Sequence, residues 1–358
     1  MSRMLRVAVA MVALAWCWQA GAAQSAAPKG QRVHEWWHEQ FPDKALNSPN
    51  AKKLPLISVK GNRFVDPQGN TVLFRGVSIG DPDKLEQGGH WNKDLFVHVQ
   101  ATGARIVRIP VHPISWRELS PEKYLQLLDQ AVEWCTELGM YIDVDWHSIG
   151  NLKEGLFQDP MYVTTVNETF QFWRTISRHF VGNNTIAFYE LFNEPTTWSG
   201  QLGRESWDEW KRINEDLIIT IRANNPQAIP LVAGFDWAYL LTPLRESPIA
   251  ADGVAYVTHP YPHKRGRPWE PKWEEDFGFA AGSYPVVATE IGYDSLARDA
   301  EGAVYGPAII KYLEGRGISW IAWAYDVEWG PQLLKSWDKF DLSESGEFFT
   351  KAMKSNSH

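Results

Sequence analysis

Two glutamates, Glu194 and Glu290, form a pair of carboxylates that could cleave a glycosidic bond. Glu194 follows the apolar run IAFYELF, and Glu290 follows the run VVAT. Glycoside cleavage needs one carboxylic acid that protonates the leaving oxygen and a second carboxylate that attacks the anomeric carbon. A separation of about 5 Å between the two groups gives retention of configuration, whereas about 6.5 to 9.5 Å leaves room for a water and gives inversion. The pair therefore supplies a candidate general acid/base, Glu194, and a candidate nucleophile, Glu290.

Polar and aromatic side chains near the ends of other apolar runs supply what such a pair requires. Asn193 can donate from its amide to a sugar 2-hydroxyl. Arg108 and Tyr261 can hold Glu290 ionised through opposite charge and hydrogen bonding, as a nucleophile requires. Glu194 instead needs partial burial and a nearby anion, so that it keeps its proton. The other candidates, which can fix hydroxyls or offer a flat face to a sugar, are His147, His259 and Trp323.

The elements that must position these residues alternate along the chain. Eight apolar runs of strand length, mostly separated by amphipathic segments of helix length, predict an α/β fold, a (β/α)8 TIM barrel. A doubly wound open sheet is the alternative, but no glycine-rich phosphate turn follows an early strand. The expected strands are 71–77, 105–109, 141–145, 186–191, 229–233, 254–258, 286–289 and 319–323, and the clearest helices are 121–138, 163–180, 206–224 and 304–316.

The candidate residues lie where these strands end. In a (β/α)8 barrel the loops that follow the strands build one face, and catalytic groups gather there. The helices after the fifth and sixth strands are poorly marked, so the strand count is weakest at that point. We expect the fourth and seventh strands, on opposite sides of the barrel, to bring Glu194 and Glu290 together across its mouth.

Residues 1–23 have the layout of a secretory signal peptide. Arg3 and Arg6 precede an apolar run, and small residues follow it, with expected cleavage after Ala22 or Ala23. The run is shorter than the roughly 20 apolar residues of a membrane span. We therefore expect export to a periplasm or the exterior, with no membrane attachment after cleavage. Lipidation of Cys17 is a minor alternative.

The mature chain is expected to hold an N-terminal arm and one catalytic domain. Residues 24–54 form the arm, in which HEWWHEQF could make a short helix, and residues 55–358 form the barrel. Turn signals near Gly61 and Gly69 predict a small N-terminal hairpin. Cys135 alone remains after cleavage, so we expect a buried, inert thiol and no intramolecular disulfide.

Composition restricts the partners. The net charge of −8 without a cluster of basic residues argues against nucleic acid. A neutral polysaccharide or oligosaccharide is easier to accept, and we expect a monomer that acts on it. The chain has 19 tryptophans, and stacking on sugar faces competes with ordinary packing as the role of each one. Those in expected strand-to-helix loops are Trp91, Trp116, Trp198, Trp237, Trp269 and Trp329.

The runs IAFYELFNEP and VATEIG, together with DWHS and THPYP, resemble glycoside hydrolase family 5, the cellulase family of retaining enzymes. The resemblance covers roughly residues 55–350, and eight site residues match in order. It implies a (β/α)8 barrel and a double displacement through a glycosyl-enzyme on Glu290, with Glu194 as acid/base. It also implies no metal and no organic cofactor. The eight residues are Arg108, His147, Asn193, Glu194, His259, Tyr261, Glu290 and Trp323.

The residue pattern argues against a metal site. It does not by itself decide the substrate. The histidines lack ligand spacing such as H-x-x-x-H, and Asp143 and Asp145 are interpreted as interior, structural residues. The DWHS motif is more similar to that of endo-β-1,4-glucanases than to that of mannanases, so the resemblance implies an endo-β-1,4-glucanase. The alternatives are a β-mannanase, a xyloglucanase, an exo-β-glucanase or β-glucosidase, and a non-catalytic carbohydrate-binding barrel. Retention of both glutamates with Arg108 and Tyr261 argues against the last.

Overall fold

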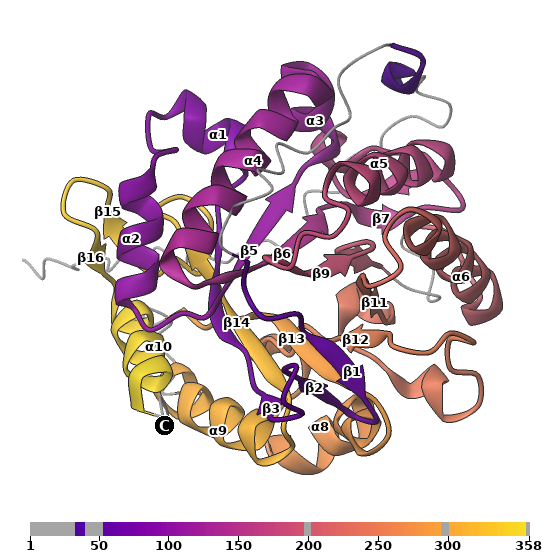
Figure 1. Ribbon diagram of the computed structural model, residues 1–358. Coiled ribbons are helices and arrows are strands. Elements are labelled where there is room, and N and C mark those ends of the chain that lie inside the picture. The colour runs from indigo at the N-terminus through magenta and orange to yellow at the C-terminus, as the bar shows by residue number, and fades with distance from the viewer. Residues whose placement is uncertain (1–32, 40–52, 197–201, 295–300, 356–358) are drawn as a thin grey trace, which may run out of the picture.

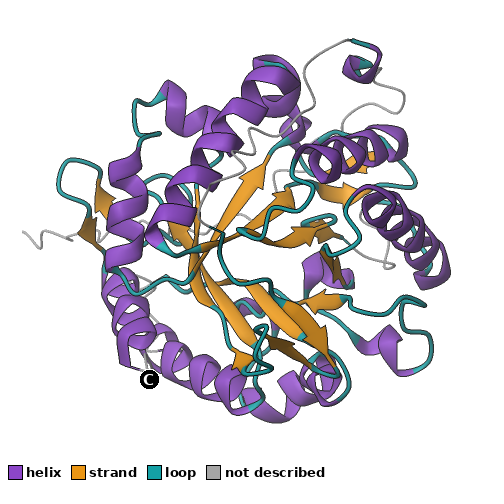
Figure 2. Cartoon of the chain, in the orientation of Figure 1, coloured by secondary structure: helices purple, strands orange, loops and turns teal. Residues whose placement is uncertain are grey.

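Eight parallel strands close into a barrel in the computed structural model, which describes residues 33–39, 53–196, 202–294 and 301–355. Helices surround the barrel (Figures 1 and 2). The predicted (β/α)8 fold is therefore confirmed. The barrel strands are β4 (Arg75–Ile79), β5 (Ile106–Val111), β6 (Tyr141–Trp146), β9 (Ile186–Glu190), β11 (Ile229–Ala233), β12 (Ala255–Val257), β13 (Val286–Ile291) and β14 (Ser319–Tyr325).

The first barrel strand begins later than the sequence predicted. The expected run 71–77 is divided between β3 (Thr71–Val72) and β4, and β3 pairs with β2 (Arg63–Val65) instead of entering the barrel. With β1 (Ser58–Lys60), the expected hairpin is therefore a three-stranded antiparallel sheet. Phe64 of this sheet packs against Phe188 of β9 with ring centroids 4.7 Å apart. The small sheet thus contributes to the apolar cluster that includes the first residues of several barrel strands.

The long helices lie close to where their amphipathic patterns predicted them. The helix α4 (Pro121–Leu138) has the expected bounds, while α5 (Val166–His179) and α6 (Trp207–Asn224) are slightly shorter than expected. Ser206 begins α6 as half of a capping box with Glu209. The remaining α-helices are α1 (Pro82–Gln87), α2 (Lys93–Ala101), α3 (Pro113–Leu119), α7 (Phe235–Ala238), α8 (Trp269–Asp276), α9 (Glu301–Gly315) and α10 (Glu344–Ser355).

Short elements follow the fifth and sixth barrel strands, where the sequence pattern was weak. After β11 comes α7, a single turn in which Asp236, Trp237 and Ala238 all have left-handed backbone angles, with φ values of 60°, 54° and 58°. Such angles are unfavourable for residues other than glycine. After β12 come the 3-10 turn η4 (Pro262–Lys264) and then α8. Neither connection carries a long amphipathic helix, which explains the weak signal.

Two further small sheets accompany the barrel. One joins β10 (Glu194–Pro195), β7 (Ile149–Asn151) and β8 (Leu156–Phe157), with β10 parallel to β7 and β7 antiparallel to β8. The other pairs β15 (Leu334–Ser336) with β16 (Asp341–Leu342). The first of them carries Glu194, so it belongs to the description of the site.

A described piece of the N-terminal arm docks on the barrel. The 3-10 helix η1 (Trp36–His38) confirms the short helix expected in this segment. Trp36 is buried, donates its indole N–H to Glu168 at 3.0 Å and packs edge-on against Trp116. The expected signal peptide and most of the arm lie outside the described residues. Within the described part of the chain, no helix combines the length and apolar character needed to cross a bilayer.

Candidate active site

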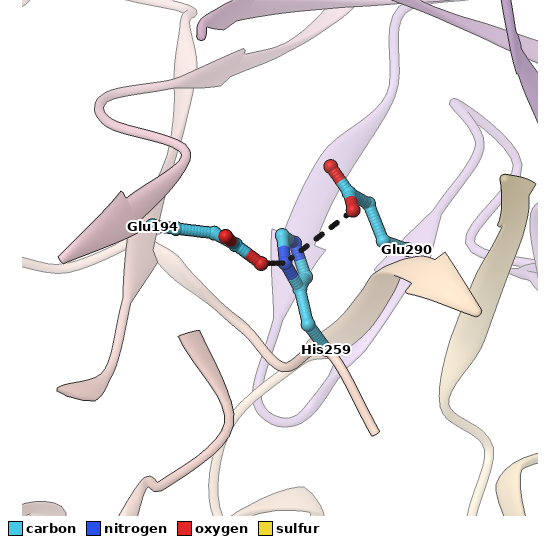
Figure 3. A group of neighbouring side chains, drawn as sticks. All are labelled: Glu194, His259 and Glu290. Carbon is cyan, nitrogen blue, oxygen red and sulfur yellow. Dashed lines mark hydrogen bonds and ion pairs between the residues drawn. The ribbon is translucent and has the colours of Figure 1, made fainter. Parts of the chain in front are cut away.

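Glu194 and Glu290 approach each other at the mouth of the barrel. Glu290 lies near the end of β13, and Glu194 lies on β10, where its backbone N–H donates to the carbonyl of Ser148 at 3.1 Å. A carboxylate oxygen of each glutamate and a ring nitrogen of His259 all lie within 4.8 Å of one another (Figure 3). This separation is in the range that retaining glycosidases use, and it is shorter than inversion requires.

Glu290 has the two partners that the sequence predicted. Arg108 donates from Nη1 to Oε1 at 2.8 Å, and the Tyr261 hydroxyl donates to Oε2 at 2.8 Å. Burial raises the pKa of Glu290 above its ordinary value. His259, Arg108 and Tyr261 oppose that shift, while Glu194 adds to it. The ionised form is thus supported by contacts but opposed by desolvation.

Arg108 contacts several side chains of the site at once. It is fully buried and donates from Nε and Nη2 to the two oxygens of Glu190, at 2.7 and 3.0 Å. Its Nη2 also lies 2.7 Å from Oδ1 of Asn193 and 2.9 Å from Oδ2 of Asp145. Burial opposes the charge of the guanidinium, but these carboxylates and Glu290 hold the pKa of Arg108 well above its usual value.

Asn193 keeps one hydrogen-bonding group free. Its Oδ1 accepts from Arg108, whereas its buried Nδ2 has no hydrogen-bond partner among the residues that the structure describes. A buried amide N–H without a partner is costly and rare. A sugar hydroxyl in the cleft would satisfy this group, as expected from the sequence.

His259 contacts both carboxylates. Its Nδ1 lies 2.9 Å from Oε1 of Glu194 and 3.8 Å from Oε2 of Glu290, and its Nε2 lies 2.9 Å from Oγ1 of Thr289. Burial lowers the pKa of His259, but Glu290, Glu190 and Glu194 together raise it to about 9. A metal-ligating imidazole must be neutral, so this histidine suits hydrogen bonding to carboxylates better than it suits a metal.

Two buried polar residues of this site were missed in the sequence. Glu190 lies inside the run IAFYELF and Thr289 ends the run VVAT, and both are fully buried. Burial opposes ionisation of Glu190, but Arg108 and His259 lower its pKa to about 2. A charged residue inside an otherwise apolar strand was the available signal, because such a residue is rarely buried without a partner.

His147 and Trp323 form one wall of the site. Their rings are stacked with centroids 5.4 Å apart and an interplanar angle of 3°, and the Arg108 guanidinium lies 5.9 Å from the Trp323 ring centroid. Asp145 accepts from Nδ1 of His147 at 2.6 Å. Asp143 and Asp145 are both fully buried, and Asp145 serves Arg108 and His147. This agrees with the structural role expected for the two aspartates.

A second histidine, His112, lies beside this wall and was also missed. It follows β5, its Nδ1 lies 2.9 Å from Oδ2 of Asp81, and its ring is 4.6 Å from that of His147. Burial lowers the pKa of His112, and Asp81 acts against that shift. The Trp329 ring centroid lies 5.7 Å from that of His112. A histidine directly after a strand that already supplies Arg108 was the signal.

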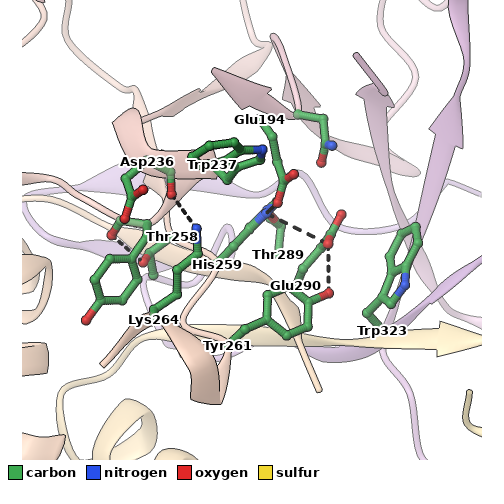
Figure 4. Close-up of polar contacts among 12 residues, drawn as sticks. Glu194, Asp236, Trp237, Thr258, His259, Tyr261, Lys264, Thr289, Glu290 and Trp323 are labelled. Carbon is green, nitrogen blue, oxygen red and sulfur yellow. Dashed lines mark hydrogen bonds and ion pairs between the residues drawn. The ribbon is translucent and has the colours of Figure 1, made fainter. Parts of the chain in front are cut away.

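The loop tryptophans divide into core and rim. Trp91, Trp116 and Trp269 pack among other aromatic rings, and Trp116 is fully buried. Trp198 lies outside the described residues. Trp237 is partly exposed and donates its indole N–H to Gln158 at 3.0 Å. It lies on the Glu194 side of the site, opposite Trp323 (Figure 4).

Comparisons with known proteins identify a matching family and a similar solved structure. Residues 65–328 match the family profile described as cellulase, glycosyl hydrolase family 5. A crystal structure of a β-glucanase from Saccharophagus degradans in complex with cellotetraose is 43% identical, with a TM-score of 0.84, and the match covers 89% of this chain and 98% of that one.

Curated relatives are more distant. Endoglucanase N of Pectobacterium atrosepticum is 23% identical over 88% of this chain and 69% of its own length. Endoglucanase A of Butyrivibrio fibrisolvens is 26% identical over 62% of this chain and 49% of its own length. This chain therefore spans about half to two thirds of the length of these relatives.

Proposed function

The chain belongs to glycosyl hydrolase family 5, the cellulase family, and on this premise we propose that it is a retaining endo-β-1,4-glucanase. The observation that carries the proposal is the close approach of the Glu194 and Glu290 carboxylates, within 4.8 Å at the mouth of the barrel. That spacing leaves no room for a water between nucleophile and anomeric carbon. The first step is then a direct attack by the protein.

In the first step, Glu290 attacks the anomeric carbon and Glu194 donates its proton to the departing glycosidic oxygen. The bond from the anomeric carbon to that oxygen breaks, and an ester bond to Glu290 forms. Arg108 and Tyr261 hold the two oxygens of Glu290 and fix the direction of attack. The free amide of Asn193 donates to the sugar 2-hydroxyl as positive charge develops on the ring.

In the second step, Glu194 is a carboxylate and removes a proton from an incoming water. The water oxygen bonds to the anomeric carbon, the ester bond breaks, and Glu290 returns to its starting state. Two inversions at one carbon restore the original β configuration. The same carboxyl group thus serves as acid and then as base, which its position beside the cleft permits.

A β-linked glucan is the substrate that the relatives support. The similar Saccharophagus protein is described as a β-glucanase and was crystallised with cellotetraose. The flat rings of Trp323 and Trp237 stand on two sides of the carboxylates (Figure 4), where pyranose faces can stack. The two rings are consistent with sugar units bound on both sides of the scissile bond, as endo cleavage requires.

Product analysis on neutral polymers tests this proposal. We expect reducing ends from hydroxyethyl-cellulose with an early fall in viscosity, little release from mannan, and a first product of β configuration by NMR. Inactivity on every β-1,4-glucan would overturn the substrate, and a first product of α configuration would overturn the retaining mechanism.

Two variants separate the roles of the glutamates. Glu290→Ala should lower kcat/KM by at least about a thousandfold even on a dinitrophenyl cellobioside, because the nucleophile is lost. Glu194→Ala should keep the attack on this good leaving group, and azide should restore its turnover with a β-glycosyl azide as product. An α-glycosyl azide from Glu194→Ala would reverse the assignment.

We also propose that the protein is exported by its leader. Residues 1–23 have the three-part layout of a signal peptide, and several similar proteins are bacterial endoglucanases. Fractionation of cells that express the full chain, with sequencing of the mature N-terminus, tests this. We expect a new N-terminus after Ala22 or Ala23 outside the cytoplasm. A cytoplasmic protein that begins at Met1 would contradict the proposal.

A further inference from the structure

A chain of buried hydrogen bonds runs behind the cleft and begins at His259. Nδ1 of this histidine lies 2.9 Å from Oε1 of Glu194, and Nε2 lies 2.9 Å from Oγ1 of Thr289. The Thr289 hydroxyl in turn lies 3.0 Å from Oε1 of Glu190. Thr289 and Glu190 are fully buried, so water cannot replace either contact.

The far end of this chain is fixed by Arg108. Two of its nitrogens donate to the two oxygens of Glu190, which makes Glu190 an ionised, acceptor-only group. A third nitrogen of Arg108 donates to Oε1 of Glu290. The candidate acid/base and the candidate nucleophile are thus joined through one continuous series of contacts.

The directions of the two hydrogen bonds at the Thr289 hydroxyl follow from the charge of Glu190. An ionised carboxylate only accepts, so the Thr289 hydroxyl must donate its hydrogen to Glu190. The same hydroxyl can then only accept from His259, which requires a hydrogen on Nε2. Nδ1 remains the ring nitrogen that faces Glu194, and it donates to Oε1 when Glu194 is ionised.

We propose that Thr289 and Glu190 are positioning residues that keep His259 protonated on both ring nitrogens, so that His259 stabilises the Glu194 carboxylate left after proton transfer. The inference rests on the proposed glycosidase mechanism. The Nδ1 hydrogen bond occupies Oε1 of Glu194 and reserves Oε2 for the leaving group. When the proton passes from Oε2 to the glycosidic oxygen, the new negative charge lies next to an imidazolium.

The charges that surround His259 agree with a cationic ring. Three carboxylates face it: Glu194 on β10, Glu190 on β9 and Glu290 on β13. On the opposing side, the buried Arg108 is shared between Glu190 and Glu290, and the neighbouring His147 is kept neutral by burial, which lowers its pKa well below the usual value. Together these carboxylates outweigh desolvation and raise the pKa of His259 to about 9.

The test compares Thr289→Val with Thr289→Ser on two aryl β-cellobiosides. Phenyl cellobioside needs a proton on its leaving oxygen, whereas dinitrophenyl cellobioside does not. Thr289→Val keeps the shape but removes the acceptor for Nε2–H. We expect kcat/KM to fall about tenfold on the phenyl substrate and less than about threefold on the dinitrophenyl substrate. Thr289→Ser should restore both values.

Thr258→Val is the matched control. Thr258 directly precedes His259 and is equally buried, but its hydroxyl donates to the carbonyl of Tyr239 and not to the His259 ring. This variant should match the parent on both substrates. Equal losses on the two substrates in Thr289→Val would indicate general distortion and would overturn the inference.

Ring-nitrogen NMR of histidine gives a readout that does not depend on turnover. In the parent, both nitrogens of His259 should stay protonated at neutral pH. In Thr289→Val, Nε2 should lose its hydrogen at lower pH. An unchanged titration would overturn the inference, whereas a parent inactive on every aryl β-cellobioside would overturn the proposed function instead.

Discussion

At the scale of single residues, the amide of Asn193 has one group bonded to the protein and one group available to a substrate. Oδ1 accepts from Arg108, and the buried Nδ2 lacks a partner within the described chain. A donor aimed at the 2-hydroxyl gains strength as the transition state forms. We expect Asn193→Ala to lower kcat about a hundredfold on an aryl cellobioside, as removal of one such donor typically does.

A substrate without the 2-hydroxyl makes this test specific. On the 2-deoxy analogue, the parent and Asn193→Ala should differ much less, because the group that the amide would bind is absent. The same hundredfold loss on both substrates would mean that Asn193 acts through Arg108 and not through the sugar. Kinetics of the two proteins on the two substrates decide between these outcomes.

The free energy of unfolding should depend on the ionisation of Glu190 at acidic pH. Its pKa is lowered to about 2 by Arg108 and His259 acting against burial. A carboxyl group with a depressed native pKa stabilises the folded state above its unfolded pKa, and this stabilisation is lost as pH falls toward the native value. The shift corresponds to a stabilisation on the order of 3 kcal/mol.

We therefore expect Glu190→Gln to be most destabilised, relative to the parent, above about pH 5 and to approach the parent toward about pH 3. Urea unfolding across this range measures the difference. Glu246→Gln, which changes an exposed glutamate in the turn after η3 (Thr242–Arg245), serves as the control. A difference that stays constant with pH would contradict the depressed pKa.

The sequence indicated eight candidate site residues by type and position, but it did not reveal the hydrogen bonds between them. Glu190 and Thr289 sit inside apolar strands, and only the closed barrel brings them next to Arg108 and His259. The pKa of Glu290 likewise depends on burial that has no local signal. Contacts between strands far apart in the chain decide these features.

At the scale of elements, the pairing in the sheet of β7, β8 and β10 could not be predicted from the periodicity of the sequence. Glu194 pairs in register with Ile149, in the connection after β6. A two-residue strand has no recognisable periodicity, and its partner lies 45 residues away by numbering. The position of Glu194 therefore depends on a hairpin in a different βα loop, which its sequence pattern did not reveal.

Gly76 shows how closely the barrel strands approach each other. It lies on β4, and a Cβ atom there would meet the carbonyl oxygen of Ile106 on β5 at 2.0 Å. We expect Gly76→Ala to lower the free energy of unfolding by about 1 to 3 kcal/mol through overpacking. Gly282→Ala is the matched control, because a Cβ at Gly282 has open space within 4 Å. Equal melting temperatures in the two variants would contradict the expected clash.

At the scale of the whole molecule, regular alternation of strands and helices was enough to predict the barrel. The signal failed where the connection itself is irregular, as in the left-handed turn of α7. It also failed to separate rim tryptophans from core tryptophans, because stacking on sugar and packing on aromatic rings favour the same residue type. Trp91 and Trp237 look alike in sequence, and only their burial distinguishes them.

The net charge of the molecule gives a prediction about charged substrates. The chain carries a formal charge of −8, and removal of the predicted leader, with its Arg3 and Arg6, makes the mature protein more negative. An anionic polymer such as carboxymethyl-cellulose is then repelled over distances of about 30 Å at 0.01 M salt but only about 8 Å at 0.15 M. The neutral polymer hydroxyethyl-cellulose experiences no such field.

We therefore expect added salt to raise kcat/KM on carboxymethyl-cellulose several-fold, because screening removes a long-range barrier to encounter. The value on hydroxyethyl-cellulose should stay constant over the same range, which controls for effects of salt on the enzyme itself. A ratio between the two substrates that does not change with salt would mean that local cations near the cleft, such as Lys84 over Trp329 and Lys264 over Trp237, cancel the net charge where the polymer binds.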